Sequence, residues 1–316
     1  MPVVDTLGLP ISSGGSMKRT AEWFEQLLQK QSVSIPQASP LQQDIDDLKF
    51  IGDAFNGKVQ LPVNTDLSDF FRRTLGLAFI IKAIHRSLRS ESSQAVLPGL
   101  ELFRGPDLSL TTIAPQSKER DKTWEYIVAC VASAFSSTVK LDEPDVRCFY
   151  SNTDLGLACK IFYTADRDSQ IDRLVVGAKQ IEKSSADLGC ILVNVTNLID
   201  HSKYLRAKPD DPEAFLSFTN WEVPLKLLQA DIVNIVQLLR GNKLVERLTQ
   251  DLRTGQERWK SRGIIFMAQT ACAFVTTPML LTVCVFYGFR RIKGVEALFL
   301  TEFNSTAQAT LNEVII

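Results

Sequence analysis

The stretch that decides the fold runs from Glu143-Pro-Asp-Val146 to Ala158-Cys-Lys160. Residues 149–150 and 155–163 have the character of two strands, and the Ser-Asn-Thr-Asp segment between them is typical of a hairpin turn. Side chains alternate along the second strand, so Lys160 and Ala158 share one face and Cys159 lies on the other. A lysine on an apolar strand usually has a carboxylate partner. The pattern therefore predicts a polar site at this hairpin.

The flanking segments extend the hairpin into a larger unit. The sequence before it predicts a helix, with the apolar stripe Trp124, Ile127, Val128, Val131 and Phe135. After it, residues 171–188 are expected to form a second amphipathic helix and residues 190–196 a buried strand. The hydrophobic period changes from 3.6 to 2 and back. Over roughly residues 119–198 the sequence thus predicts a helix, a three-strand meander, a helix and a fourth strand in one mixed sheet.

Pro144-Asp145 and Lys160, in this order of elements, resemble the PD-(D/E)XK superfamily of restriction-endonuclease-like nucleases. The resemblance implies an α/β (α+β) fold with a mixed sheet flanked by helices. It also implies Mg²⁺-dependent hydrolysis of nucleic-acid phosphodiester bonds, with Mn²⁺ as a substitute and DNA expected more than RNA. Ala158 stands where the second acid of the motif belongs, so the chain departs from the pattern at that position.

The resemblance assigns the candidate site residues. Asp145, Lys160 and Glu125 are the candidate catalytic residues, and Asp145, Glu125 and the backbone carbonyl of Cys159 are the candidate metal ligands, because Mg²⁺ prefers hard oxygen ligands. Glu125, on the first helix, is expected to replace the acid missing at Ala158.

Lys179 and Gln180, on the second helix, are candidate substrate-binding residues. Simpler roles stay open for all of these residues. Asp145 is also a normal turn residue, and Glu125, Lys179 and Gln180 also suit a solvated helix face. The alternative function is a catalytically inactive nuclease-like module that binds nucleic acid or a partner protein.

Composition limits the function classes. A net charge of −1 in 316 residues gives no global signal for nucleic acid or membrane, so a nuclease would need a local basic surface. The six cysteines show no paired spacing, which predicts reduced thiols in a cytoplasmic protein. With only two histidines, a histidine-based metal site or catalytic triad is not expected, and His201 is assigned no role.

Residues 264–287 form an uncharged run of 24 residues, which is long enough for a membrane-spanning helix. The run is rich in β-branched residues and is interrupted by Thr276-Thr277-Pro278. These features favour strands at 264–275 and 279–288 with a turn at 276–278. The alternative is a membrane helix, and with it a membrane-tethered effector.

The rest of the chain is predicted to be largely helical. Residues 1–115 are expected to be an N-terminal helical region with a linker, and 116–316 a nuclease-like domain. The N-terminal helices are a candidate surface for a partner protein or for a second copy of the chain. The expected elements are a flexible leader (1–16), helices at 19–30, 41–55 and 66–88 with an N-cap at Asn64 or Thr65, a linker (90–115) with a short strand near 108–113, a helical region (212–255) divided at Pro224 and Gly241, and a last helix (298–311).

Overall fold

The computed structural model describes residues 3–8, 14–55, 66–91, 93–105, 110, 115–205, 207–208, 211–215, 217–220, 222–239, 241–242, 260–274, 277–288 and 295–311. Its helices and strands are, in chain order, β1 (Val3–Gly8), α1 (Gly14–Lys30), α2 (Pro40–Phe55), α3 (Leu67–Leu88), α4 (Ser93–Val96), the 3-10 helix η1 (Leu97–Arg104), α5 (Lys118–Ser133), β2 (Thr138–Lys140), β3 (Val146–Tyr150), β4 (Thr153–Ile161), α6 (Arg167–Lys183), β5 (Leu188–Asn194), the 3-10 turns η2 (Thr196–Leu198) and η3 (His201–Lys203), β6 (Ala207–Lys208), β7 (Asp211–Phe215), α7 (Glu222–Leu238), β8 (Ser261–Phe274), β9 (Thr277–Gly288) and α9 (Val295–Leu311).

A seven-stranded mixed sheet organises the described part of the chain, in the order β1-β9-β8-β5-β4-β3-β2. Strands β2, β3 and β4 form an antiparallel meander, and β5 lies parallel to β4 after the crossover through α6. The predicted order of helix, three-strand meander, helix and fourth strand is therefore confirmed, as is the mixed α/β class. β8 continues the sheet parallel to β5, and β9 and β1 complete it.

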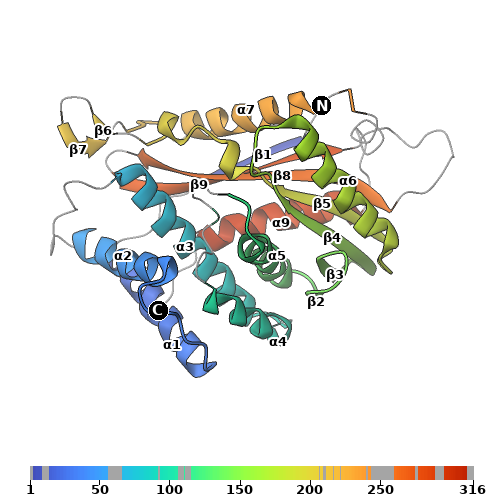
Figure 1. Cartoon of the computed structure of the whole chain (residues 1–316), viewed down its shortest axis with the longest axis horizontal. Coiled ribbons are helices and arrows are strands. Elements are labelled where there is room, and N and C mark those ends of the chain that lie inside the picture. Colours follow the sequence, from blue (N-terminus) through green and yellow to red (C-terminus); the bar gives the residue numbers. More distant parts are fainter. Residues whose placement is uncertain are drawn as a thin grey trace.

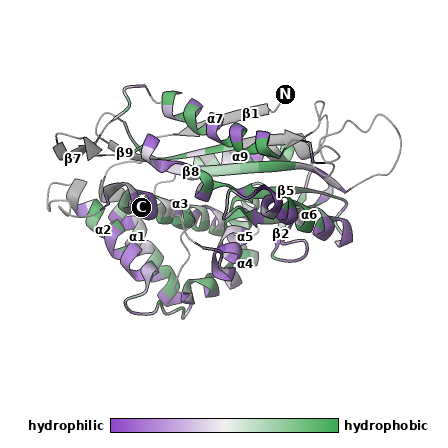
Figure 2. Ribbon diagram, turned by 45° about the horizontal axis from the view of Figure 1, so that its top comes forward, coloured by the Kyte–Doolittle hydropathy of each residue, from purple (hydrophilic) through white to green (hydrophobic). Residues whose placement is uncertain are grey.

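Helices cover both faces of the sheet (Figure 1). α6 and α7 lie on one face, where Ala158 of β4 and Phe162, directly after β4, belong to a hydrophobic cluster with Leu174 and Ile181 of α6. α3, α5 and α9 lie on the other face, together with the alternate residues of β4, among them Cys159. Hydrophobic residues concentrate along the central strands and the helix sides that face them (Figure 2). The odd and even positions of β4 thus serve two separate cores.

The apolar run at 264–287 forms the hairpin of β8 and β9 inside this sheet, which confirms the predicted pair of strands. The two strands pair from Gly263–Gly288 to Phe274–Thr277. The sequence had predicted Pro278 in the turn, but in the structure it lies within β9. Residues 275–276, which join the strands, lie outside the described residues. Among the helices of the described part of the chain, none has the length and apolar character needed to cross a bilayer.

Two expectations for the first third of the chain were wrong. Residues 1–16 are not simply a leader, because Val3–Gly8 pairs with β9 as an edge strand and α1 already begins at Gly14. The expected linker at 90–115 contains the short helices α4 and η1. The partner of β1 is β9, which is far away in the sequence, so the six residues of β1 alone carry little sequence signal for a strand. This explains why residues 1–16 were expected to be a leader.

Residues 212–255 also differ from the expected helix. Residues 211–215 form strand β7, and the helix α7 begins only at Glu222, with Pro224 in its first turn. A proline is tolerated there because the first turn needs no donor from its backbone nitrogen. Residues 243–259 and most of the strand expected near 108–113 lie outside the described residues. The N-cap of α3 is Asp66, whereas the expected caps, Asn64 and Thr65, also lie outside them.

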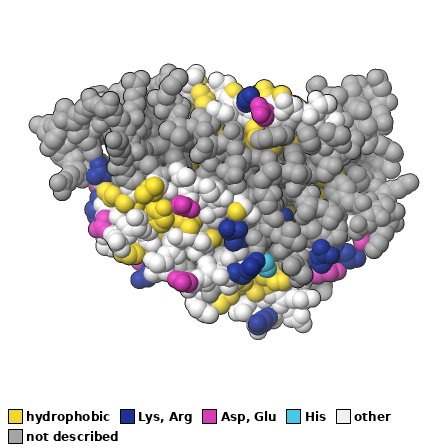
Figure 3. Space-filling view, turned by 180° about the vertical axis from the view of Figure 1, so that it is seen from behind, with side chains coloured by type: hydrophobic (Ala, Val, Ile, Leu, Met, Phe, Trp, Pro, Cys, Tyr) yellow, Lys and Arg dark blue, Asp and Glu magenta, His cyan; other side chains and the backbone are white. Residues whose placement is uncertain are grey.

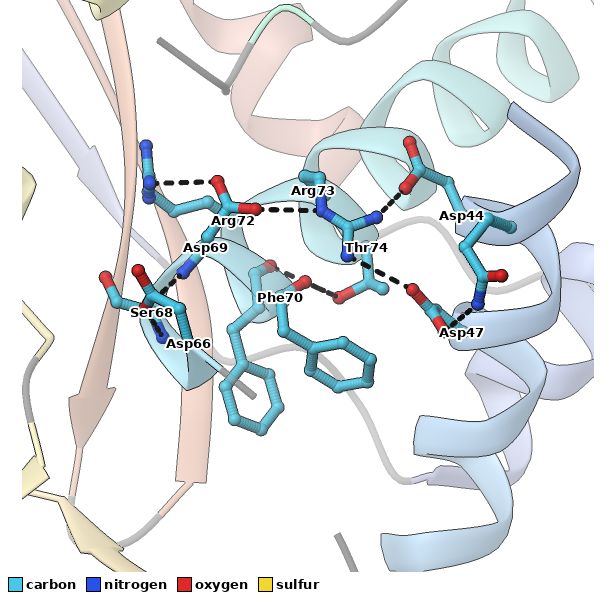
Figure 4. A network of polar contacts seen from close by, with 11 residues as sticks. Asp44, Asp47, Asp66, Ser68, Asp69, Phe70, Arg72, Arg73 and Thr74 are labelled. Carbon is cyan, nitrogen blue, oxygen red and sulfur yellow. Dashed lines mark hydrogen bonds and ion pairs between the residues drawn. The ribbon is translucent and has the colours of Figure 1, made fainter. Parts of the chain in front are cut away.

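An ion network joins α2 to α3. Arg73 of α3 binds Asp44 and Asp47 of α2 as well as Asp69 of its own helix (Figure 4). The buried side chains of α1 to α3 belong to the same hydrophobic cluster as those of α5. The domain boundary near residue 115 stays a prediction.

Candidate functional site

The candidate site begins where β4 extends beyond its neighbour β3. The last ladder pair joins Val146 to Leu157, so the peptide groups of Cys159 point past the first residue of β3. Side chains therefore bind the Cys159 peptide groups, which have no backbone partner in β3. The Cys159 N–H donates to Asp145 Oδ2 at 2.7 Å, and the Cys159 carbonyl accepts from Lys160 Nζ at 2.9 Å. Asp145 immediately precedes β3 and is therefore held at the open end of the strand pair.

Asp145 and Lys160 form a buried ion pair. Their Oδ2 and Nζ atoms are 2.6 Å apart, and the side chains are only 9% and 10% exposed. Gln180 of α6 donates from Nε2 to the second carboxylate oxygen, Asp145 Oδ1, at 3.2 Å. Short charge-assisted hydrogen bonds such as that between Lys160 Nζ and Asp145 Oδ2 are the strong ones in proteins. Both oxygens of Asp145 are thus oriented from the α6 side of the sheet.

The α5 side of the same site is a cavity of about 440 Å³ between η1, α5 and the segment from Leu141 to Asp145. The acids among its lining residues are Glu101, Glu125, Asp142, Glu143 and Asp145, and Lys122 also lines it. Glu125 and Asp145 therefore border a common space. Glu125 is bound there by Lys122, whose Nζ lies 2.6 Å from Glu125 Oε2.

Burial raises the pKa of the Glu125 carboxyl, and the negative charge of Asp145 acts in the same direction against the Lys122 contact. Burial likewise raises the pKa of Asp121, which is one turn earlier on α5, although Arg173 opposes this effect. These shifts show that additional negative charge at the site is unfavourable. Acids in such a cleft retain protons more readily than surface acids, or need cations beside them.

Sequence reasoning missed a second polar group next to the pair. Tyr163 donates to Asp121 Oδ1 at 3.0 Å, and Arg173 lies 3.6 Å from the same oxygen and stacks over the Tyr163 ring at 5.1 Å. Arg173 is on α6, so this contact joins α6 to Asp121 of α5. The available signal was the tyrosine at the end of an apolar strand, since buried tyrosine hydroxyls usually need a partner.

The structure corrects the expectation for Ala158. Its side chain is fully buried under α6, and a Cβ built on Gly177 would lie 3.4 Å from the Cβ of Ala158. No acid-sized gap exists there. Glu125 approaches the site from α5, across the edge of β4, and so does not occupy the space above Ala158.

The other predicted residues fall in different places. Lys179 is exposed, whereas Gln180 contacts Asp145. The Cys159 thiol is buried in the core on the α5 side, and burial raises its pKa well above the ordinary value, so it is not a nucleophile. His201 is also buried, between Thr270 and the Thr196 carbonyl, and burial lowers its pKa to about 3, which keeps the ring neutral.

The donor set suits a weakly held, hydrated cation. Within the described ranges, no group of three or more His, Cys, Asp or Glu side chains is arranged to enclose a metal ion. Asp145 and Glu125 nevertheless line one cavity, and Mg²⁺ usually keeps several waters and binds through one or two carboxylates. Asp145 and Glu125 are therefore the side chains through which a hydrated Mg²⁺ or Mn²⁺ would bind.

Comparison of the chain with models of known protein families, with curated proteins and with solved structures found no match.

Proposed function

We propose that the protein is a metal-dependent nuclease that hydrolyses nucleic-acid phosphodiester bonds, with DNA as the favoured substrate. One observation carries the proposal: the Asp145–Lys160 ion pair closes the open end of β4 beside a cavity that Glu125 also lines. The order of the elements around it, from α5 to β5, supports a restriction-endonuclease-like core. Pro144-Asp145 and Lys160 match two of the three positions of the PD-(D/E)XK motif.

In this proposal each residue has a separate task. Asp145 and Glu125 hold a hydrated Mg²⁺ or Mn²⁺, which activates water and stabilises negative charge on the phosphate. Lys160 keeps a fixed positive charge next to Asp145, where it favours an attacking water in its deprotonated form. Gln180 fixes the direction of the Asp145 carboxylate, so that its free electron pairs point to one side.

The surface sets a condition on substrate binding. On the face shown in Figure 3, the described Lys and Arg side chains lie in small groups among Asp and Glu. The cavity wall itself is mostly acidic. Phosphate groups would approach it only with a divalent cation present, so cleavage should depend strictly on the ion.

The test measures cleavage of labelled single- and double-stranded DNA and RNA by the purified chain with Mg²⁺, with Mn²⁺ and with a chelator. We expect ion-dependent cleavage that falls by about 100-fold or more in Lys160→Met and Asp145→Asn. Lys203→Met, which removes a lysine from an exposed pair with Asp231, is the matched control and should cleave normally.

Breaking a buried ion pair also destabilises a protein, by about 3 kcal/mol or more. The two variants must therefore be shown to be folded by circular dichroism at the assay temperature. Wild-type protein that cleaves none of the four substrates with either ion would refute the nuclease proposal.

A second candidate is a non-catalytic module with a nuclease-like core. It is favoured by the way Lys160 already occupies Asp145 Oδ2 and the Cys159 carbonyl, the two oxygens that the resemblance assigns to a metal. An ammonium in that position can replace the ion structurally. Binding of nucleic acid without cleavage, unchanged in the presence of a chelator, would support this module over the enzyme.

A further inference from the structure

The two lysines of the site hold their carboxylates in different ways. Lys160 is 10% exposed, and its ammonium is bound to both Asp145 and the Cys159 carbonyl, so it is held in place by two partners. Lys122 is 60% exposed, whereas its partner Glu125 is 10% exposed. A lysine side chain with most of its length in solvent can leave an ion pair at little cost.

The contacts of Glu125 show why Lys122 would have to move. Lys122 Nζ lies 2.6 Å from Glu125 Oε2, so it occupies the carboxylate that a cation would use. A divalent cation bound to Glu125 would be repelled by an ammonium group this close. Movement of Lys122 into solvent removes that repulsion, while the other acids of the cavity wall, Glu101, Asp142 and Glu143, still attract the cation.

We propose that Lys122 is an exchangeable counter-ion, which occupies Glu125 in the free protein and is displaced when a divalent cation binds. The inference rests on the proposed function, because it assigns the cation to Asp145 and Glu125. It defines how the site is regulated: the ion and Lys122 compete for one carboxylate. Lys160, in contrast, stays in place in both states.

The experiment compares binding of Mn²⁺ to full-length variants by electron paramagnetic resonance of the free ion, with Mg²⁺ followed by calorimetry. Lys122→Met removes the competitor and a nearby positive charge, so the dissociation constant should fall about tenfold. Lys122→Arg keeps the charge and should bind like the wild type. Lys118→Met, which removes an exposed lysine four residues earlier on α5, is the matched control and should also bind like the wild type.

A double variant tests whether the gain in ion affinity depends on the Glu125 carboxylate. Lys122→Met with Glu125→Gln should lose the gain in affinity, because the carboxylate that the lysine protected is gone. Ion binding that appears only in Lys122→Met would also support the inference. Wild-type protein that binds Mn²⁺ and cleaves, with Lys122→Met binding no more tightly, would overturn the inference and leave the nuclease proposal standing. Failure of both the wild type and Lys122→Met to bind either ion would overturn both.

Discussion

Ala158 shows how one small residue can mark the limit of a motif. In the resembling superfamily its position carries an acid, yet here it is packed beneath Gly177 of α6 with no exposed surface. A larger side chain would have to push the helix away from the sheet. The small residues at 158 and 177 therefore allow close contact between β4 and α6, and this contact is incompatible with a carboxylate at 158.

We expect Ala158→Glu to destabilise the protein by about 2–4 kcal/mol, because it overpacks a closed core and buries a charge. It should not improve ion-dependent cleavage, although it restores the acid of the motif. Chemical denaturation checks the first expectation, with Ala230→Glu on the exposed side of α7 as a control that should leave stability nearly unchanged. A variant that is as stable as the wild type and more active would contradict this view of the site.

The sequence was sufficient to predict a polar site at the hairpin and a carboxylate partner for Lys160, and in the structure that partner is Asp145. It was not sufficient to predict where Glu125 lies relative to the sheet. Periodicity identifies the buried stripe of a helix but not which sheet face the stripe covers, and α5 and α6 take opposite faces. Asp121 and Arg173 meet only through that arrangement, so no local pattern could reveal their contact.

At the scale of the elements, the ion pairs between α2 and α3 are made by one residue, Arg73. Asp44 is almost fully buried, and burial raises its pKa from 3.8 to about 6, although Arg73 opposes this shift. The folded protein therefore holds a proton on Asp44 that the unfolded chain would release between these two pH values. The contribution of Asp44 to stability should be largest below about pH 4 and should decrease as the pH rises through about 6.

We expect Arg73→Met to lower the free energy of unfolding by about 2–4 kcal/mol near neutral pH, because it leaves the Asp44 carboxylate buried without its cation. The loss should be smaller at about pH 5, where Asp44 is protonated. Urea denaturation at the two pH values measures both effects. Lys226→Met removes an exposed ion pair with Glu222 on α7 and should change stability little at either pH. An equal loss at both pH values would show that Asp44 is not the group responsible.

At the scale of the whole molecule, the first described strand and the last described helix both lie against β9. β1 pairs along the outer edge of β9, and α9 packs against both strands (Figure 1). Without β1, the long apolar strand β9 would become an uncovered edge, which is a common starting point for aggregation. The predicted hairpin correctly identified the centre of the fold, whereas its edge partner came from residues that were expected to be a leader.

Deletion of residues 1–10 should therefore lower the melting temperature and make the protein associate as its concentration rises. Thermal scanning measures the first effect, and light scattering across a range of protein concentrations measures the second. Replacement of residues 3–8 by lysine-rich sequence of equal length is the control: it should also lose pairing but associate less, because charge protects an exposed edge. A deletion variant that melts like the wild type and stays monomeric would show that β1 is dispensable.

The short reach of β3 has a consequence for the kind of molecule that can enter the site. The Cys159 peptide obtains its partners from Asp145 and Lys160 because the neighbouring strand has not yet begun. A ligand that drew Asp145 into the cavity would strip a buried amide of its acceptor, at a cost of about 1–3 kcal/mol. A molecule or ion that leaves Asp145 in place avoids this cost. The main chain of β4 therefore resists movement of the Asp145 carboxylate, and a ligand has to accept the carboxylate in the position in which it is held.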